Sequence, residues 1–191
     1  MFLLKIILER RNKMDTISQL LCQILQDELF PSMLSSKEDV SIVTAYEEGK
    51  EYKIGIMLYD INDNALSSNM FIDEGNTLRY ASKNIELSYL IYLNMTSTFG
   101  GSNALLQQRL LTKILQVIYD HPCIEIKPQS VSIFLEKLTI EDKIRIWQSF
   151  SKPLQPAIYI KASPVCIPST RTKEIHRVQT VEHTIQKKEV E

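Results

Sequence analysis

Apolar residues recur every three or four positions in three stretches of the chain, which places them on one face of an α-helix. The pattern predicts two longer helices, over residues 15–29 and 105–118, and a short one from Thr139 to Trp147. Pro31 and Pro122 follow the two longer stretches, as expected after a helix has ended. The apolar positions concerned are Ile17, Leu20, Leu21, Ile24, Leu25 and Leu29, then Leu105, Leu106, Leu110, Leu111, Ile114, Leu115 and Ile118, then Ile140, Ile144 and Trp147.

Alternating or β-branched residues predict strands between these helices. The first two predicted strands are joined by a short turn with Gly49, which predicts a β-hairpin. Prolines bracket the last strand, which favours a place at the edge of a sheet. The central strand is apolar on one face and partly apolar on the other, so its sheet is buried on one side and half-covered on the other. The predicted strands are 40–46, 52–59, 85–95, 131–135 and 157–167.

The stretch from Asp60 to Asn84 is polar and is predicted to be a long loop. The resulting order, α-β-β-β-α-β-α-β, lacks a regular βα alternation. We therefore predict an α+β fold, in which a mixed, mostly antiparallel sheet is packed by two longer helices and one short helix.

The chain divides into one domain with two arms. Residues 1–13 are predicted to be an N-terminal arm or an upstream-start extension, since basic residues follow the apolar run instead of preceding it as in a signal peptide. That run is also far shorter than the roughly 20 apolar residues that a membrane span needs. Residues 14–170 form the predicted domain, and 171–191 a C-terminal arm too sparse in apolar residues for a core of its own.

Composition narrows the class of protein. Hydrophobic residues make up 44% and charged residues 24% of the chain, which excludes disordered and fibrous classes. With a net charge of −1, the chain lacks the excess of basic residues that nucleic-acid-binding proteins usually carry. Three scattered cysteines, Cys22, Cys123 and Cys166, argue against disulfides and zinc, and each is predicted to be a small buried apolar residue.

Candidate chemistry is sparse. Residues 60–65 resemble the start of a calcium-binding loop, but the sixth position is Ala65 instead of glycine and the twelfth is Phe71 instead of glutamate. His121 ends a predicted helix, where a structural role is expected. His176 and His183 lack metal-ligand spacing, and Gly100-Gly101-Ser102 is a turn with an N-cap, not a phosphate loop. By elimination these residues favour binding or assembly over catalysis, with no metal and no cofactor.

Two features favour contacts with other chains. Trp147 is the single tryptophan; core packing is the default interpretation, and an interface anchor is the alternative. The C-terminal arm is either a solvated end or a segment that pairs with the sheet edge of another chain. Its candidate interface residues are Ile175, Arg177, Val178, Val181 and Ile185.

Several segments together resemble the N-terminal domain of the cap, or tail-terminator, proteins of phage-tail-like contractile injection systems. The resemblance covers roughly residues 14–175 and depends on the order and spacing of the segments. They are the entry helix Ile17–Leu29, the strand ending Leu58–Asn64, the strand Leu87–Leu93, the helix Leu105–Tyr119 closing with Asp120-His121-Pro122, Ile146–Phe150 running into Lys152–Ile160, and Pro164–Ile167.

The resemblance implies a tail-terminator-like fold and a structural protein that is not an enzyme. It implies a homohexameric ring that ends the inner tube and holds the last ring of the tail sheath, with tube and sheath proteins as partners. Nucleic acid and membrane insertion are not expected. The ring would be assembled in the bacterial cytoplasm and end at the baseplate-distal tip of the particle.

Two alternatives remain. One is another phage-tail assembly component, such as a tail completion or adaptor protein. The other is a small metal-dependent enzyme that uses the carboxylates of the 60–84 segment, namely Asp60, Asp63, Asp73 and Glu74.

Overall fold

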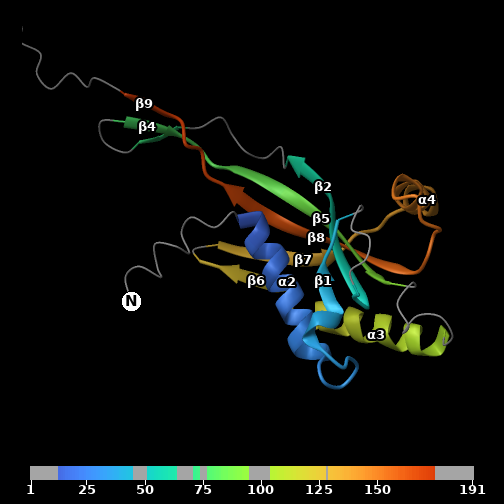
Figure 1. Ribbon diagram of the computed structural model, residues 1–191. Coiled ribbons are helices and arrows are strands. Elements are labelled where there is room, and N and C mark those ends of the chain that lie inside the picture. The colour runs from blue at the N-terminus through green and yellow to red at the C-terminus, as the bar shows by residue number, and fades with distance from the viewer. Residues whose placement is uncertain are drawn as a thin grey trace, which may run out of the picture.

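The computed structural model describes residues 13–44, 51–63, 71–73, 77–94, 104–127 and 129–174. Its centre is a six-stranded sheet in the order β1-β2-β5-β8-β7-β6, and a three-stranded sheet, β3-β4-β9, extends from one end (Figure 1). The strands are β1 (Val40–Ile42), β2 (Ile54–Asp63), β3 (Phe71–Asp73), β4 (Thr77–Tyr80), β5 (Lys83–Leu93), β6 (Cys123–Ile126), β7 (Gln129–Leu135), β8 (Ala157–Ile167) and β9 (Thr172–Glu174).

Helices cover both faces of the larger sheet. The long helices α2 (Lys13–Leu29) and α3 (Ala104–Asp120) pack on one face, and the short helix α4 (Ile140–Ser149) packs on the other (Figure 1). A 3₁₀ turn, η1 (Lys37–Asp39), leads into β1 and is capped reciprocally by Ser36 and Asp39. The predicted α+β class and the predicted helices are confirmed, as is the mostly antiparallel sheet.

Strand β5 shows why both faces are covered. Leu87, Tyr89 and Ile91 belong to the larger core under α2 and α3, whereas Leu90 and Tyr92 belong to a smaller core with Trp147 of α4. Since successive side chains of a strand point to opposite faces, one strand supplies both cores. The sequence prediction of a sheet buried on one side and partly covered on the other is confirmed.

The predicted hairpin between the first two strands is wrong. Strand β1 lies parallel to β2, with Val40 opposite Ile54 and Ile42 opposite Ile56. The backbone N–H of Lys53 donates to the carbonyl of Asp39 at 2.8 Å, so both strands begin at the same end of the sheet. A tight turn reverses the chain and cannot produce this arrangement, because a parallel pair needs a return crossing.

The predicted edge position of β8 is also wrong, since β8 lies between β5 and β7. Its internal proline is tolerated because the register shifts there: Ser163 and Pro164 together face Glu86 alone, which is a β-bulge. The backbone pairing of β8 with β7 ends at Ser163, and beyond it the side chain of Gln129 hydrogen-bonds to the backbone of β8. Its Nε2 donates to the carbonyl of Pro164, and its Oε1 accepts from the N–H of Cys166 at 3.2 Å.

The polar stretch from Asp60 to Asn84 is not a simple loop. Strand β2 continues to Asp63 and β5 begins at Lys83, while β3 and β4 lie between them in the smaller sheet. The third strand of that sheet, β9, comes from residues 172–174. Most of these residues are exposed or half-buried, so the segment lacks the apolar alternation that identifies a strand.

We expect Gly55→Ala to lower the free energy of unfolding by about 1–3 kcal/mol, measured by urea denaturation. An added Cβ would lie 2.8 Å from Cζ of Tyr92 and 3.0 Å from Cε2 of Tyr52. The two rings cannot separate freely, because their hydroxyls are hydrogen-bonded at 2.7 Å and Tyr92 packs edge-on against Trp147. In a Tyr92→Leu background the same alanine should cost less. An equal cost in both backgrounds would contradict the steric explanation.

Candidate assembly surfaces

A cluster of charged side chains lies on the same face of the larger sheet as α4. Nζ of Lys161 lies 2.6 Å from Oε1 of Glu86 and 3.3 Å from Oε1 of Glu136. The hydroxyl of Tyr59 donates to Oε2 of Glu136. The hydrogen bond to Glu86 raises the pKa of Lys161, and burial, followed by Glu136, raises the pKa of Tyr59 far above its usual range. Both groups therefore hold their protons at neutral pH, and Lys161 carries its charge beside the two carboxylates.

The calcium-loop resemblance at Asp60 falls on a strand. Asn62 Nδ2 donates to Asp60 at 2.8 Å, and Asp63 pairs with Lys83 at 3.3 Å. An extended strand spaces its side chains along a line, so these oxygens do not wrap around one ion as in a cation-binding loop. Within the described residues no group of three or more His, Cys, Asp or Glu side chains is placed to hold a metal ion. Asn64, Ala65 and Glu74 lie outside the described residues.

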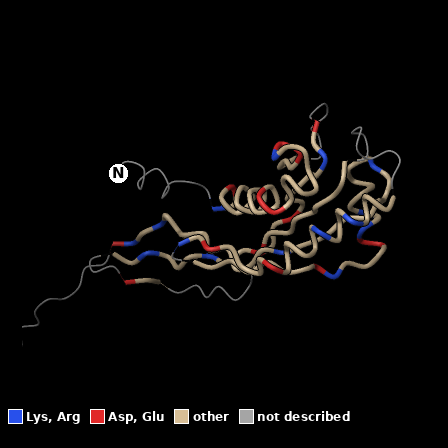
Figure 2. The backbone as a smooth tube through the Cα atoms, turned by 90° about the horizontal axis from the view of Figure 1, so that it is seen from below, with Lys and Arg blue, Asp and Glu red and all other residues tan. Residues whose placement is uncertain are grey.

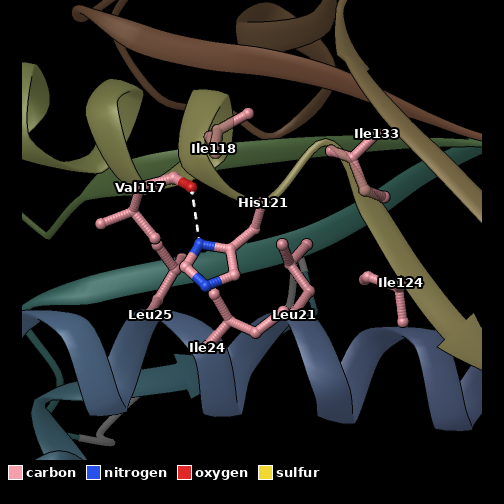
Figure 3. A pocket seen from close by; sticks show the side chains of 8 residues that line it. All are labelled: Leu21, Ile24, Leu25, Val117, Ile118, His121, Ile124 and Ile133. Carbon is pink, nitrogen blue, oxygen red and sulfur yellow. Dashed lines mark hydrogen bonds between the residues drawn. The ribbon is translucent and has the colours of Figure 1, made fainter.

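His121 closes helix α3, as predicted. Its backbone N–H and its Nδ1 each lie 3.0 Å from the carbonyl of Val117, which belongs to the last turn of the helix. Figure 3 shows the ring between α3 and α2, in a hollow lined otherwise by aliphatic side chains. The histidine thus satisfies a helix end and fills the gap between two helices. His176, His183 and the Gly100-Gly101-Ser102 turn lie outside the described residues.

The cysteines differ in exposure. Cys22 is buried against the carbonyl of Val40, with 3.6 Å between Sγ and the oxygen, and Cys166 is half-buried. Cys123 is exposed, so the prediction of a buried residue is wrong there. It begins β6, an edge strand whose alternate side chains face outward.

An apolar surface surrounds the start of α4. Trp147 is buried beneath the helix, with Nε1 donating to the hydroxyl of Tyr159 at 2.9 Å, which confirms its core position. Ile140 and Ile144 were expected on the same side but are 54% and 37% exposed. Ile140 and the 45% exposed Leu154 line a groove whose lining also includes Tyr159. Exposed apolar groups gathered in this way are typical of a protein-protein contact.

A second candidate surface is the tip formed by β3, β4 and β9, which projects away from the helices (Figure 1). Phe71 and Ile72 are adjacent in β3, and both are about half exposed, at 47% and 44%. They point to opposite faces of a three-stranded sheet, so apolar groups are exposed on both of its sides. Sequence reasoning missed this surface, since it expected a loop here.

The predicted interface residues Ile175, Arg177, Val178, Val181 and Ile185 lie outside the described residues. The first residues of the predicted 171–191 arm include β9 and belong to the tip, and the described chain ends there, at Glu174. Acidic and basic residues are interspersed along the described backbone (Figure 2). Among the residues that the structure describes, no helix is long and apolar enough to span a membrane.

The family of the chain follows from comparison with known proteins. The family model described as the Pvc16 N-terminal domain matches residues 16–180. The chain belongs to this family. The match includes the whole described domain after the first turn of α2, and it continues past β9 into the arm. The family predicted from the sequence segments is thereby confirmed, and no curated protein matches the chain significantly in sequence.

The fold of this Pvc16 N-terminal domain is also found in a solved structure. The sheath/tube terminator of PVC, an extracellular contractile injection system, in its extended state superposes with a TM-score of 0.57 at 15% identity. The alignment covers 88% of this chain and 63% of the terminator, so the chain spans less than two thirds of that protein. The anti-feeding prophage cap, a tube-terminating cap, gives a TM-score of 0.49 at 16% identity, covering 83% of this chain and 60% of the cap.

Proposed function

We propose that this chain is a structural cap, or tail-terminator, subunit of a contractile injection system. The observation that carries the proposal is the family match over residues 16–180, supported by the fold shared with a sheath/tube terminator. The chemistry of the described residues is compatible, because Lys161 is paired with carboxylates and His121 satisfies a helix end. Contacts with other chains, and not a reaction, are the proposed activity.

The proposed assembly is a homohexameric ring at the baseplate-distal end of the particle. It would stop growth of the inner tube and hold the last sheath ring, after assembly in the bacterial cytoplasm. A closed ring with head-to-tail contacts requires two different surfaces on each subunit. The apolar surface around Ile140 and the tip around Phe71 lie at opposite ends of the larger sheet, as such contacts require (Figure 1).

The solution mass of the purified full chain tests the ring, measured by light scattering and followed by negative-stain imaging. A mass of about six subunits with annular particles is the expected result. If the chain is monomeric alone, the ring is expected after addition of assembled inner tubes with sheath protein. A chain that stays monomeric with tubes present and does not bind sheath would refute the proposal. Co-purification with the baseplate or a capsid connector would favour a tail completion or adaptor protein instead.

Truncation of the C-terminal arm tests the proposed sheath contact. Deleting residues 171–191 is expected to leave a folded domain and to abolish sheath binding. Because β9 pairs with β4, a second variant lacking residues 175–191 keeps the described tip intact and removes the arm alone. Both variants should lose sheath capture in a pull-down while keeping a cooperative thermal transition. An unfolded truncated chain, or full sheath binding by the 175–191 deletion, would contradict the proposal.

A further inference from the structure

The chain leaves the larger sheet along a fixed path. After β8 ends at Ile167, β9 pairs with β4, placing Thr172 opposite Arg79 and Glu174 opposite Thr77. The pairing extends one residue toward β8, because the N–H of Tyr80 donates to the carbonyl of Arg171 at 3.2 Å. Backbone contacts with β4 thus hold residues 171–174, which directly precede residues 175–191.

Side chains reinforce this path across all three strands of the tip. The guanidinium of Arg171 lies over the ring of Tyr80, with its Cζ 5.0 Å from the ring centroid. Tyr80 packs in turn against Phe71 of β3, with 4.7 Å between ring centroids. On the other side, the N–H of Arg171 donates to Oγ of Ser169 at 3.2 Å. We call the row of three side chains the Arg171–Tyr80–Phe71 stack.

The stack is not part of the hydrophobic core. Tyr80, Phe71 and Arg171 belong to neither of the two buried clusters, and in the part of the chain that the structure describes, β3 and β9 make their main contacts with β4 alone. A three-stranded sheet without a covering layer adds little stability to the domain. What the stack does determine is the position and direction of the backbone at Glu174, where residues 175–191 follow.

We propose that the Arg171–Tyr80–Phe71 stack is a positioning element that fixes the backbone up to Glu174, from which residues 175–191 continue, and thereby strengthens the capture of sheath protein. The inference rests on the proposed sheath-binding role of the arm. A fixed position at Glu174 matters, because it reduces the freedom of orientation that is lost on binding.

The test compares sheath affinity across variants of the full chain. Tyr80→Ala and Arg171→Ala should each weaken binding of purified sheath protein about 3- to 10-fold, as expected for loss of one exposed cation–π or aromatic contact. Arg171→Lys keeps a cation near the ring and should restore most of the affinity. Tyr119→Ala is the matched control, since it removes a 66% exposed tyrosine from α3 and should bind as the unmodified chain does.

A second readout separates positioning from general stability. A synthetic peptide of residues 175–191 should bind sheath more weakly than the full chain, and Tyr80→Ala should bring the full chain toward the peptide's affinity with an unchanged thermal transition. Undiminished binding by Tyr80→Ala, when deletion of 175–191 abolishes binding, would overturn the positioning role and leave the proposed function standing. Undiminished binding by the deletion would refute the role of the arm, and the positioning role with it.

Discussion

Replacing Trp147 by alanine is expected to lower the free energy of unfolding by about 3–5 kcal/mol, the usual cost of emptying a large buried site. The side chain is 1% exposed and lies edge-on to Tyr92, with ring centroids 5.6 Å apart. Its Nε1 also donates to the hydroxyl of Tyr159, which would be left without this bond. The helix α4 contributes Trp147 as its one fully buried side chain, so the alanine variant removes the main attachment of the helix to the sheet.

Urea denaturation followed by far-UV circular dichroism measures this effect, since the variant lacks the single tryptophan used for fluorescence. Trp147→Phe keeps an aromatic ring in the site and should cost less than the alanine variant. Ile140→Ala, in the same helix but 54% exposed, should change stability by no more than about 0.5 kcal/mol. If Trp147→Ala costs no more than Ile140→Ala, the described packing of α4 is wrong.

Raising the pH from 10 to 12 is expected to destabilise the domain by several kcal/mol, with about 2 kcal/mol from Tyr89 alone. Burial raises the pKa of Tyr89 to about 12 from the ordinary value of 10.0. Burial also raises the pKa of Tyr59, and the hydrogen bond to Glu86 raises that of Lys161. A raised folded-state pKa gives stability that is complete below the unfolded pKa and is lost as the pH rises through the folded one.

The free energy of unfolding measured at intervals from pH 9 to pH 12 checks this prediction. Tyr89→Phe removes one of the titrating groups and should reduce the slope by up to about 1.4 kcal/mol per pH unit. At neutral pH the same variant loses the hydrogen bond between Tyr89 and Ser18, 2.9 Å long, and should cost about 1 kcal/mol. A stability that does not change between pH 10 and 12 would contradict the burial of these hydroxyl groups.

Local patterns predicted the elements that bury one face. Helices α2 and α3 each carry an apolar stripe of the correct period, because a single face of each meets the core. These local patterns could not predict the order of the strands in the sheet, because strand pairing depends on partners far away in the sequence. Pro164 illustrates this limit: it favoured an edge strand, whereas a bulge and the side chain of Gln129 accommodate it at the centre of the sheet.

The candidate surfaces were harder to predict for a physical reason. Phe71 lies in a strand that is exposed on both faces and Tyr80 in one that is half-buried on both, so hydrophobic periodicity is absent there. The contact between Arg171 and Tyr80 joins residues 91 positions apart, and neither residue type suggests the pairing by itself. The family could be predicted because it depends on the order of many segments, whereas the five arm residues from Ile175 to Ile185 remain a prediction.

The central position of β8 has a consequence for biosynthesis. The strand that joins β5 to β7 leaves the ribosome after both of them, so the sheet of the nascent chain stays in two separate parts until residues 157–167 emerge. During that interval both β5 and β7 present unpaired edges, which are the usual sites of misassembly between neighbouring chains. The pairing of β5 with β8 is also long-range, which slows folding.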